Sequence, residues 1–349
     1  MPGKQRVSAQ DVAREAGVSR TTVSFVLNNT PGKSISEATR QRVVDAAARL
    51  GYTPNEDARR LASIRDQNLG LFICHSQFVY SDAFITRALE GMSQAVNRLR
   101  ARLIVQPVTL GETSYLDLAR KDDVDGIVLL NTHDEDPALH ELLASGFPAV
   151  SMDYLEDLAI DQVCVEDAEA ASVIVSHLTG LGHRRIGMIT HADPVYVASR
   201  RRLMGYTRAL EAAGIPMDTD IVRYADFSES SGYQQMKDLL GKAPDITAVF
   251  CGNDVVAYGA MQAILQSGRS IPGDISLTGF DDDYMSRFLN PALTTMVLPA
   301  AGLGAAAIEL VTKRMNSGAG PKPDRRVLST HIAIRASTAP PPSAVLTSS

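Results

Sequence analysis

Residues 7–28 read VSAQDVAREAGVSRTTVSFVLN, and this stretch predicts two short helices joined by a glycine turn. Ser8 and Asp11 have the spacing of a capping box, and Gly17 can adopt the left-handed conformation that ends a helix. Ser19 can then cap a second helix. Helix, tight turn and capped second helix define a helix-turn-helix, whose second helix lies in the major groove of DNA.

The second helix is expected to have an apolar and a polar face. Its buried side would consist of Val18, Val23, Val26 and Leu27. Its outer side would show Arg20, Thr21, Thr22, Ser24 and Phe25. A third helix is predicted from Ser36 to Gly51, and its Val43, Val44, Ala47 and Leu50 are expected to close a small core. The alternative is a small three-helix bundle without a DNA-binding role, but the exposed polar face favours DNA binding.

Charge is distributed unevenly along the chain. Residues 1–65 hold eleven Lys and Arg against six Asp and Glu, a net charge of +5, so the remainder carries -11 of the total of -6. A basic head on an acidic body is expected when only the head meets phosphate. A basic surface that is merely solvated would give the same net charge. The sequence pattern therefore has to distinguish DNA binding from a solvated surface.

The segment after the third helix predicts a marginal helix. Pro54 starts a new segment, and residues 55–63 contain helix formers but almost no apolar stripe. A nine-residue helix is mostly unfolded in water unless another surface supports it. The alternative is an ordinary linker.

From Asn68 the pattern changes to apolar runs that alternate with helical segments. Buried parallel strands are predicted at residues 69–73, 102–106, 125–130, 148–153, 185–190, 248–251 and 276–280. The intervening helices are predicted at 84–99, 115–121, 138–144, 168–180, 200–213, 230–240 and 255–267. This alternation, which restarts after Glu166, predicts two doubly wound parallel sheets with ligands at the carboxyl ends of their strands.

Several classes of protein are disfavoured. No phosphate-binding glycine motif, Gly-x-Ser-x-Gly elbow or metal-spaced histidine cluster occurs, so we expect no cofactor, no metal and no enzymatic activity. No apolar run is long enough for a membrane span, and the start lacks the apolar core of a secretory signal. Cys74, Cys164 and Cys251 are widely spaced in apolar surroundings, which indicates buried thiols in a cytoplasmic protein. Its predicted DNA-binding head would associate it with the nucleoid.

The stretches DVAREAGVSRTTVSFVLN and ISEATRQRVVDAAARLGYTPNEDARRLAS resemble the head of the lactose/galactose repressor (LacI/GalR) family. The match runs without a gap over about sixty residues. The resemblance implies a transcription factor, most simply a repressor, with a helix-turn-helix, a third helix and a hinge helix that folds on operator DNA.

The resemblance also implies DNA-binding roles for particular residues. Arg20 and Thr21 occupy positions that read base edges in the major groove. The positions with phosphate-binding and helix-capping roles are Ser19, Thr22, Ser24 and Asn28. In the hinge helix, which starts at Asn55, Leu61 stands where the family inserts a leucine into the minor groove, and the small Ala58 permits close approach.

Phe25 departs from the family pattern, because many members have arginine at this position. Phenylalanine cannot donate hydrogen bonds to guanine, but it can contact a thymine methyl group. Base readout is therefore expected to differ in part from that of arginine-bearing members. The alternative role for Phe25 is packing against the third helix.

The body also resembles this family and its periplasmic sugar-binding relatives, in stretches such as SRRRLMGYTRALEAAGI, AVFCGNDVVAYGAMQAI and ISLTGFDDDYMSRFLNPALTTM. Arg202, Asn253 and Asp281 match residues that bind polar groups of the effector. A guanidinium, an amide and a carboxylate can together bind the hydroxyls of a sugar. The remaining candidates are Asp153, Phe227 as an aromatic wall, and His75, Ser76, Phe78 and Phe84 at the rim. Asn253 and Asp281 could instead be capping or turn residues, and the rim positions could be unrelated to binding.

Leu298 is a second departure, since members often have glutamine here. The expected effector is a small polar molecule, most simply a sugar, and Leu298 gives it an apolar neighbour. The predicted domains are a DNA-binding head (1–54), a hinge (55–65), an effector-binding and dimerisation body (66–337) and a disordered tail (338–349). Within the body, lobe one comprises 66–166 plus about 300–327, and lobe two comprises 167–296 plus about 328–337. Three crossovers between lobes would act as a hinge.

The overall expectation is an all-α helix-turn-helix head on an α/β body of two doubly wound parallel-sheet lobes, like a periplasmic binding protein. A homodimer is expected because a pseudo-palindromic double-stranded operator requires two heads at fixed spacing. The tail has no leucine heptads, so it does not predict a tetramer. Two rival interpretations are an exported sugar-binding protein and an α/β enzyme that holds a metal through Asp281, Asp282 and Asp283.

Overall fold

The computed structural model describes residues 8–27, 35–50, 52, 67–75, 79, 82–109, 111, 113–317 and 322–342. The chain divides into two compact units, Met1–Arg65 and Asp66–Ser349. The predictions for Asn28, Asn55, Ala58, Leu61, Ser76 and Phe78, and for the Ser24 side chain, lie outside the described residues. The same holds for the hinge segment 55–65.

The head is a three-helix unit, as predicted. Its helices are α1 (Ala9–Ala16), α2 (Arg20–Leu27) and α3 (Glu37–Leu50). Ser8 and Asp11 form the predicted capping box, and Gly17 ends α1 with a φ of 66°. Ser19 caps α2, because its Oγ accepts a hydrogen bond from the Thr22 backbone N–H at 3.0 Å.

A small apolar core holds the three head helices together. Its buried members are Val12, Ala13, Ala16, Val23, Val26, Val43, Ala46 and Ala47. The prediction that Val44 belongs to this core is wrong, since Val44 is 44% exposed. It directly follows the buried Val43, and successive residues of a helix point about 100° apart, so the two side chains cannot share one face.

The body contains two six-stranded sheets, which confirms the predicted fold class. The first sheet comprises β1 (Asn68–Ile73), β2 (Arg102–Pro107), β3 (Gly126–Leu130), β4 (Ala149–Ser151), β5 (Asp161–Cys164) and β11 (Arg325–Val327), in the order β11-β5-β4-β3-β1-β2. The second comprises β6 (Ile186–Thr190), β7 (Val222–Tyr224), β8 (Ala248–Cys251), β9 (Ser276–Asp281), β10 (Thr294–Val297) and β12 (His331–Ala333), in the order β12-β10-β9-β8-β6-β7. Among the strand pairs of the described residues, β10–β12 alone is antiparallel.

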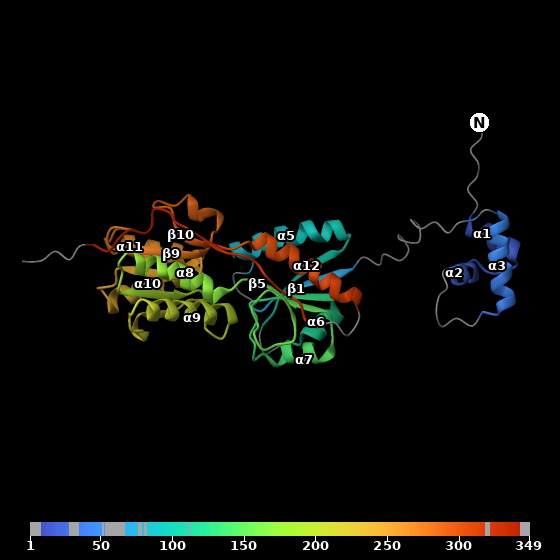
Figure 1. Cartoon of the computed structure of the whole chain (residues 1–349), viewed down its shortest axis with the longest axis horizontal. Coiled ribbons are helices and arrows are strands. Elements are labelled where there is room, and N and C mark those ends of the chain that lie inside the picture. Colours follow the sequence, from blue (N-terminus) through green and yellow to red (C-terminus); the bar gives the residue numbers. More distant parts are fainter. Residues whose placement is uncertain are drawn as a thin grey trace, which may run out of the picture. The chain divides into compact units, whose positions relative to one another are not determined.

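Helices cover both faces of each sheet (Figure 1). Around the first sheet, α5 (Ala83–Leu99) and α12 (Ala300–Ser317) pack on one face, and α6 (Tyr115–Lys121) and α7 (Pro137–Ser145) on the other. Around the second, α8 (Asp167–Gly180) and α9 (Val197–Ala212) oppose α10 (Glu229–Lys242) and α11 (Asp254–Gln266). Two 3₁₀ helices, η1 (Thr219–Ile221) and η2 (Tyr284–Arg287), complete the second lobe.

The chain passes between the two sheets three times. It crosses from β5 to α8, from β10 to α12, and from β11 to β12. The first sheet with its helices is called lobe one below, and the second is called lobe two. Since the carboxyl ends of parallel strands gather at one edge of each sheet, the crossovers bring these two edges to the same cleft.

Among the strands that the apolar runs did not predict are β5 and β7. β5 lacks an apolar run because it contains the buried polar residues Asp161 and Gln162. Arg314 holds the Asp161 carboxylate through two hydrogen bonds of 2.5 Å, and Gln162 exchanges side-chain hydrogen bonds with the Leu155 backbone. β7 has only three residues, too few for a periodic pattern.

The prediction of a disordered tail from residue 338 is wrong for residues 338–342. The Ala339 N–H donates to Ser276 Oγ at 3.0 Å, and the Ser276 hydroxyl donates to the Ala339 carbonyl at 2.9 Å. His183 Nε2 lies 2.9 Å from the same carbonyl. Hydrogen bonds between lobe-two side chains and the Ala339 backbone therefore hold this part of the tail against lobe two, although the tail is rich in proline and serine.

The three cysteines are free and buried, as predicted. No helix among the described residues is long and apolar enough to cross a membrane.

Candidate functional site

The exposed face of α2 carries the residues predicted to read DNA. Arg20 and Thr21 are exposed, and Ser19 is exposed at the cap. The Thr22 hydroxyl lies 2.9 Å from Ser19 Oγ, so Thr22 takes part in the cap itself. Phe25 is half-buried. This partial exposure is compatible with contact to a DNA base and with packing against the third helix.

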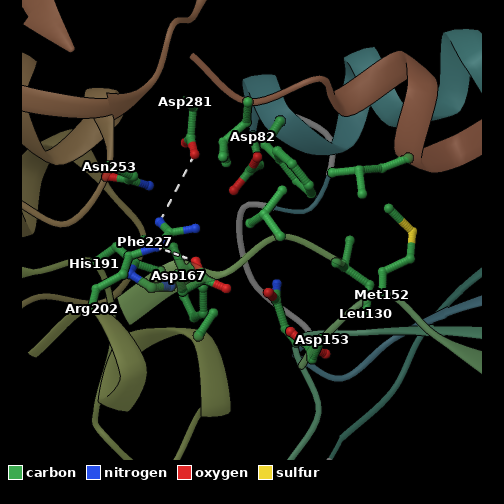
Figure 2. Close-up of a pocket in the computed structure, with 16 residues that line it drawn as sticks. Asp82, Leu130, Met152, Asp153, Asp167, His191, Arg202, Phe227, Asn253 and Asp281 are labelled. Atoms are coloured by element: carbon green, nitrogen blue, oxygen red, sulfur yellow. Dashed lines mark hydrogen bonds and ion pairs between the residues drawn. The ribbon is translucent and has the colours of Figure 1, made fainter. Parts of the chain in front are cut away.

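A pocket between the two lobes collects most of the predicted effector-binding residues. Phe84, Asp153, Arg202, Phe227, Asn253 and Asp281 all line it. Figure 2 shows Arg202, Asn253 and Asp281 on one side and Asp153 and Met152 on the other. We call this space the inner pocket. His75 does not line it, but lines an adjoining space, called the outer pocket, which shares Phe227 with the inner one.

Elements from both lobes position the lining side chains at strand ends. Asp153 follows β4, Asn253 follows β8 and caps α11, and Asp281 is the last residue of β9. Arg202 projects from α9. Asn253 caps α11, which was the alternative role considered for it, because its side-chain Oδ1 accepts a hydrogen bond from the Val256 N–H at 2.8 Å. It nevertheless lines the pocket, so a cap and a ligand contact can coexist in one side chain.

Arg202 is held rigidly at the base of the inner pocket. Its Nε donates to Asp167 Oδ1 at 2.8 Å, and its Nη1 donates to the Gly252 carbonyl at 2.6 Å. The guanidinium also lies 3.9 Å above the Phe280 ring. Because several contacts fix a planar donor group, Arg202 is already oriented for a polar ligand.

Burial shifts the protonation of the carboxyl groups in this pocket. It raises the pKa of Asp153 to about 6, although the Thr132 N–H and hydroxyl, at 2.8 and 2.9 Å from its Oδ2, oppose the shift. Burial also raises the pKa of Asp281 well above its ordinary range, against the attraction of Arg202, whose Nη1 is 3.8 Å away. Burial raises the pKa of Asp82 in the same way.

Rings from both lobes surround Phe227. Its ring stacks on His75 with centroids 4.3 Å apart, and Tyr196 and His191 meet it edge-on at 5.1 and 5.5 Å. His133 in turn packs edge-on against Tyr196 at 4.5 Å. Phe227 has a φ of 71°, which is strained for a bulky residue, and its N–H donates to the His191 carbonyl at 2.6 Å.

Sequence reasoning missed several lining residues. They include Asp82, Asp167, His133, His191 and Tyr196. Asp82 could have been found as a polar cap before a helix that follows a strand, since it caps α5. The sequence did not indicate a binding role for Asp167 or His191. Acidic residues are common in the first turn of a helix, and a histidine after a strand is also an ordinary feature. Leu298 does line the inner pocket and is buried, so this wall is apolar, as expected.

The acidic run 281–283 does not form one cluster. Asp281 faces Arg202, Asp282 pairs with Arg335 at 2.5 Å, and Asp283 accepts from the Tyr258 hydroxyl at 2.7 Å. Within the described part of the chain, no three His, Cys, Asp or Glu side chains are grouped as a metal site. The three carboxylates therefore make separate contacts, and of the three only Asp281 lines the inner pocket.

Comparison with known proteins identifies both units. Residues 8–55 match the model of the bacterial regulatory proteins of the lacI family, and residues 175–338 match a periplasmic binding protein-like domain. The transcriptional regulator CelR of Thermobifida fusca is 32% identical over 97% of this chain and 100% of its own length. Catabolite control protein A of Priestia megaterium is 30% identical over 89% of this chain and 93% of its own length.

Solved structures give the same result. A CelR–cellobiose complex superimposes with a TM-score of 0.71, at 30% identity, over 95% of this chain and all of the other. The lac repressor dimer bound to operator and an anti-inducer superimposes with a TM-score of 0.70, at 27% identity, over 96% and 100%. The chain thus has the architecture of a DNA-binding transcriptional regulator, not of an enzyme. It belongs to the LacI family of bacterial regulatory proteins.

Proposed function

We propose that this regulator is a cytoplasmic homodimeric repressor whose affinity for a pseudo-palindromic operator is set by a sugar bound between the lobes. The observation that carries the proposal is the inner pocket, where Arg202, Asn253 and Asp281 of lobe two face Asp153 of lobe one. A ligand that contacts both sides favours the closed arrangement of the lobes. The resulting shift in equilibrium equals its differential affinity for the closed and open states.

The DNA-binding half of the proposal rests on α2. Its exposed Arg20 and Thr21 would read base edges, while Ser19, Thr22, Ser24 and Asn28 would serve the cap and the phosphates. Asn55, Ala58 and Leu61 would form the hinge helix, with Leu61 as the wedge in the minor groove. Lobe movement would act on this helix by changing the spacing between the two copies in the dimer.

Selection of binding sequences from a random DNA pool tests the proposal directly. The full chain should enrich a pseudo-palindrome with two half-sites, because each protomer presents one α2 helix. Fluorescence anisotropy with the selected DNA should then show an affinity that changes when the effector sugar is added. Enrichment of a single asymmetric site, or of no sequence, would contradict the dimeric operator-binding role.

A further inference from the structure

The two adjoining pockets differ greatly in size. The inner pocket has a volume of about 40 Å³, and the outer pocket about 430 Å³. Pockets that bind small molecules span roughly 300–1,000 Å³. The inner pocket has room for only about three water molecules, so the lobes have to part further before it can hold a ring. The outer pocket already has space for one.

The outer pocket is walled by rings from both lobes. His75 and His133 come from lobe one, and Tyr196 and Phe227 from lobe two. A pyranose ring has apolar C–H faces and a polar edge of hydroxyls, so its faces pack well against aromatic side chains. The wall is thus suited to a sugar ring that lies beyond the polar residues of the inner pocket.

An unsatisfied imidazole nitrogen lies at each of the two pockets. Within the described part of the chain, His191 Nδ1 and His133 Nε2 are buried without a hydrogen-bond partner. His191 is 5% exposed and lines the inner pocket, and His133 lines the outer one. Burial lowers the pKa of both side chains, which keeps them neutral near pH 7. A hydroxyl can donate to or accept from a neutral imidazole, so it satisfies either tautomer.

The charges of the lining residues disfavour an anionic ligand. Six carboxyl groups line the two pockets, and Arg202 is the only Lys or Arg among the described lining residues. The Asp167 carboxylate, 2.8 Å from Nε, already pairs with Arg202. A phosphate or carboxylate on the ligand would be desolvated next to carboxylates without a free cation, which is strongly unfavourable.

The carboxylates do not require a cationic ligand either. Thr132 donates twice to Asp153, and the Ser228 N–H and hydroxyl both donate to Asp226, at 3.2 and 2.5 Å. The Val195 N–H donates to Asp193 at 2.9 Å. These donors already stabilise the negative charge, and the remaining lone pairs can accept from hydroxyl groups.

We infer that the outer pocket is a second sugar subsite, and that the effector is an uncharged saccharide of at least two rings whose outer ring lies against Tyr196, His75 and Phe227. This inference rests on the proposed function, because it specifies the ligand of the same cleft. His191 and His133 supply hydrogen bonds that select a hydroxylated ring over a purely apolar one.

Isothermal titration calorimetry on the full chain tests the inference. The probes are cellobiose, maltose, glucose, glucose 6-phosphate, glucosamine and adenine. At least one of the two disaccharides should bind about ten-fold or more tightly than glucose, and the charged sugars should bind no better than glucose. Tight binding of glucose 6-phosphate or glucosamine would overturn the uncharged class, and binding of adenine alone would replace the saccharide by a nucleobase.

Tyr196→Ala separates the outer subsite from the inner one. Loss of one aromatic contact should weaken disaccharide binding about ten-fold, while glucose binding stays unchanged. Tyr196→Phe, which keeps the ring, should behave like the wild type. Tyr233→Ala is the matched control, because Tyr233 lies in lobe two outside both pockets and bonds to Gln266.

The outcomes also distinguish the inference from the proposed function. If glucose and the disaccharides bind equally, or if Tyr196→Ala weakens both to the same extent, the second subsite is refuted and the sugar-responsive repressor stands. If no sugar in the panel binds the wild type, both are refuted. A thermal melt of each variant confirms that the loss does not come from unfolding.

Discussion

The imidazole ring of His75 stacks on the phenyl ring of Phe227, with centroids 4.3 Å apart and planes 6° from parallel. His75 follows β1 in lobe one and Phe227 follows β7 in lobe two, so this stack joins the lobes across the cleft. The Val197 N–H, which donates to the Thr132 carbonyl at 3.2 Å, is a backbone hydrogen bond between the same two lobes. The stack and this hydrogen bond are two of the contacts that hold the lobes together across the cleft.

Replacing Phe227 by leucine should loosen lobe closure. The change removes an aromatic stack worth about 0.5–1.5 kcal/mol, so the amide of Val197 should exchange its hydrogen about two- to ten-fold faster. Hydrogen exchange followed by mass spectrometry measures this in a peptide that contains Val197. Phe227→Tyr keeps the stack and should leave the rate unchanged; equal rates in the wild type and Phe227→Leu would argue against a role in closure.

Arg202→Ala should abolish the response of DNA binding to the effector while leaving operator affinity itself nearly intact. The guanidinium is the cationic donor in the inner pocket, and its removal leaves Asp167 without its partner at 2.8 Å. That loss should also lower the free energy of unfolding by about 3–5 kcal/mol. Operator anisotropy with and without sugar, together with a urea titration, measures both effects.

Arg208→Ala is the matched control for this variant. Arg208 lies on the same helix, but it is exposed and does not line the inner pocket. The effector response should survive in Arg208→Ala. A full response in folded Arg202→Ala would remove Arg202 from the effector site.

Arg20→Ala should weaken binding to the selected operator far more than binding to random DNA. An arginine that contacts a base edge contributes about 1–3 kcal/mol of discrimination, so specific affinity should fall about ten-fold or more. Anisotropy titrations on both DNAs at one salt concentration provide the measurement. Arg14→Ala, which changes an exposed arginine of α1, should reduce binding to both DNAs slightly and equally. Equal losses on the two DNAs for Arg20→Ala would assign Arg20 to phosphate contacts.

Asp153→Asn should stabilise the body at neutral pH. Burial raises the pKa of Asp153 to about 6 in the folded state, against about 4 in the unfolded chain. The folded state therefore binds this proton more tightly, and its stability falls as the pH rises from about 4 to about 6. The asparagine avoids this penalty of up to about 3 kcal/mol, and its side-chain oxygen can still accept from Thr132.

Urea titrations at several pH values check this prediction. The two proteins should be nearly equal in stability at pH 4, and the variant should be more stable at pH 7.5. A constant difference across the range would mean that the Asp153 carboxyl has an ordinary pKa in the folded state. The same substitution should also remove pH dependence of effector affinity near pH 6, since only the ionised carboxylate is a pure hydrogen-bond acceptor.

The head could be predicted from sequence almost residue by residue. Ser8, Asp11, Gly17 and Ser19 act on groups three or four positions away, so their capping roles are local and can be recognised in a linear pattern. The prediction of buried positions was wrong for Val44, which was expected in the core beside Val43 but is exposed. The long apolar strands of the body were likewise recognisable. By contrast, β5 was hidden by the polar residues Asp161 and Gln162, and Arg314, which holds the Asp161 carboxylate, is distant in sequence.

The sequence by itself determined the class of fold, the DNA-reading helix and, through family resemblance, the positions of Arg202, Asn253 and Asp281. Only the tertiary structure decided which side chains meet them. Asp82, Asp167 and His191 join the inner pocket, and Tyr196 the outer one, because parallel strands deliver their carboxyl ends to one edge and three crossovers place two such edges face to face. Contacts made in this way depend on strand order and lobe closure, and neither leaves a periodic signal along the chain.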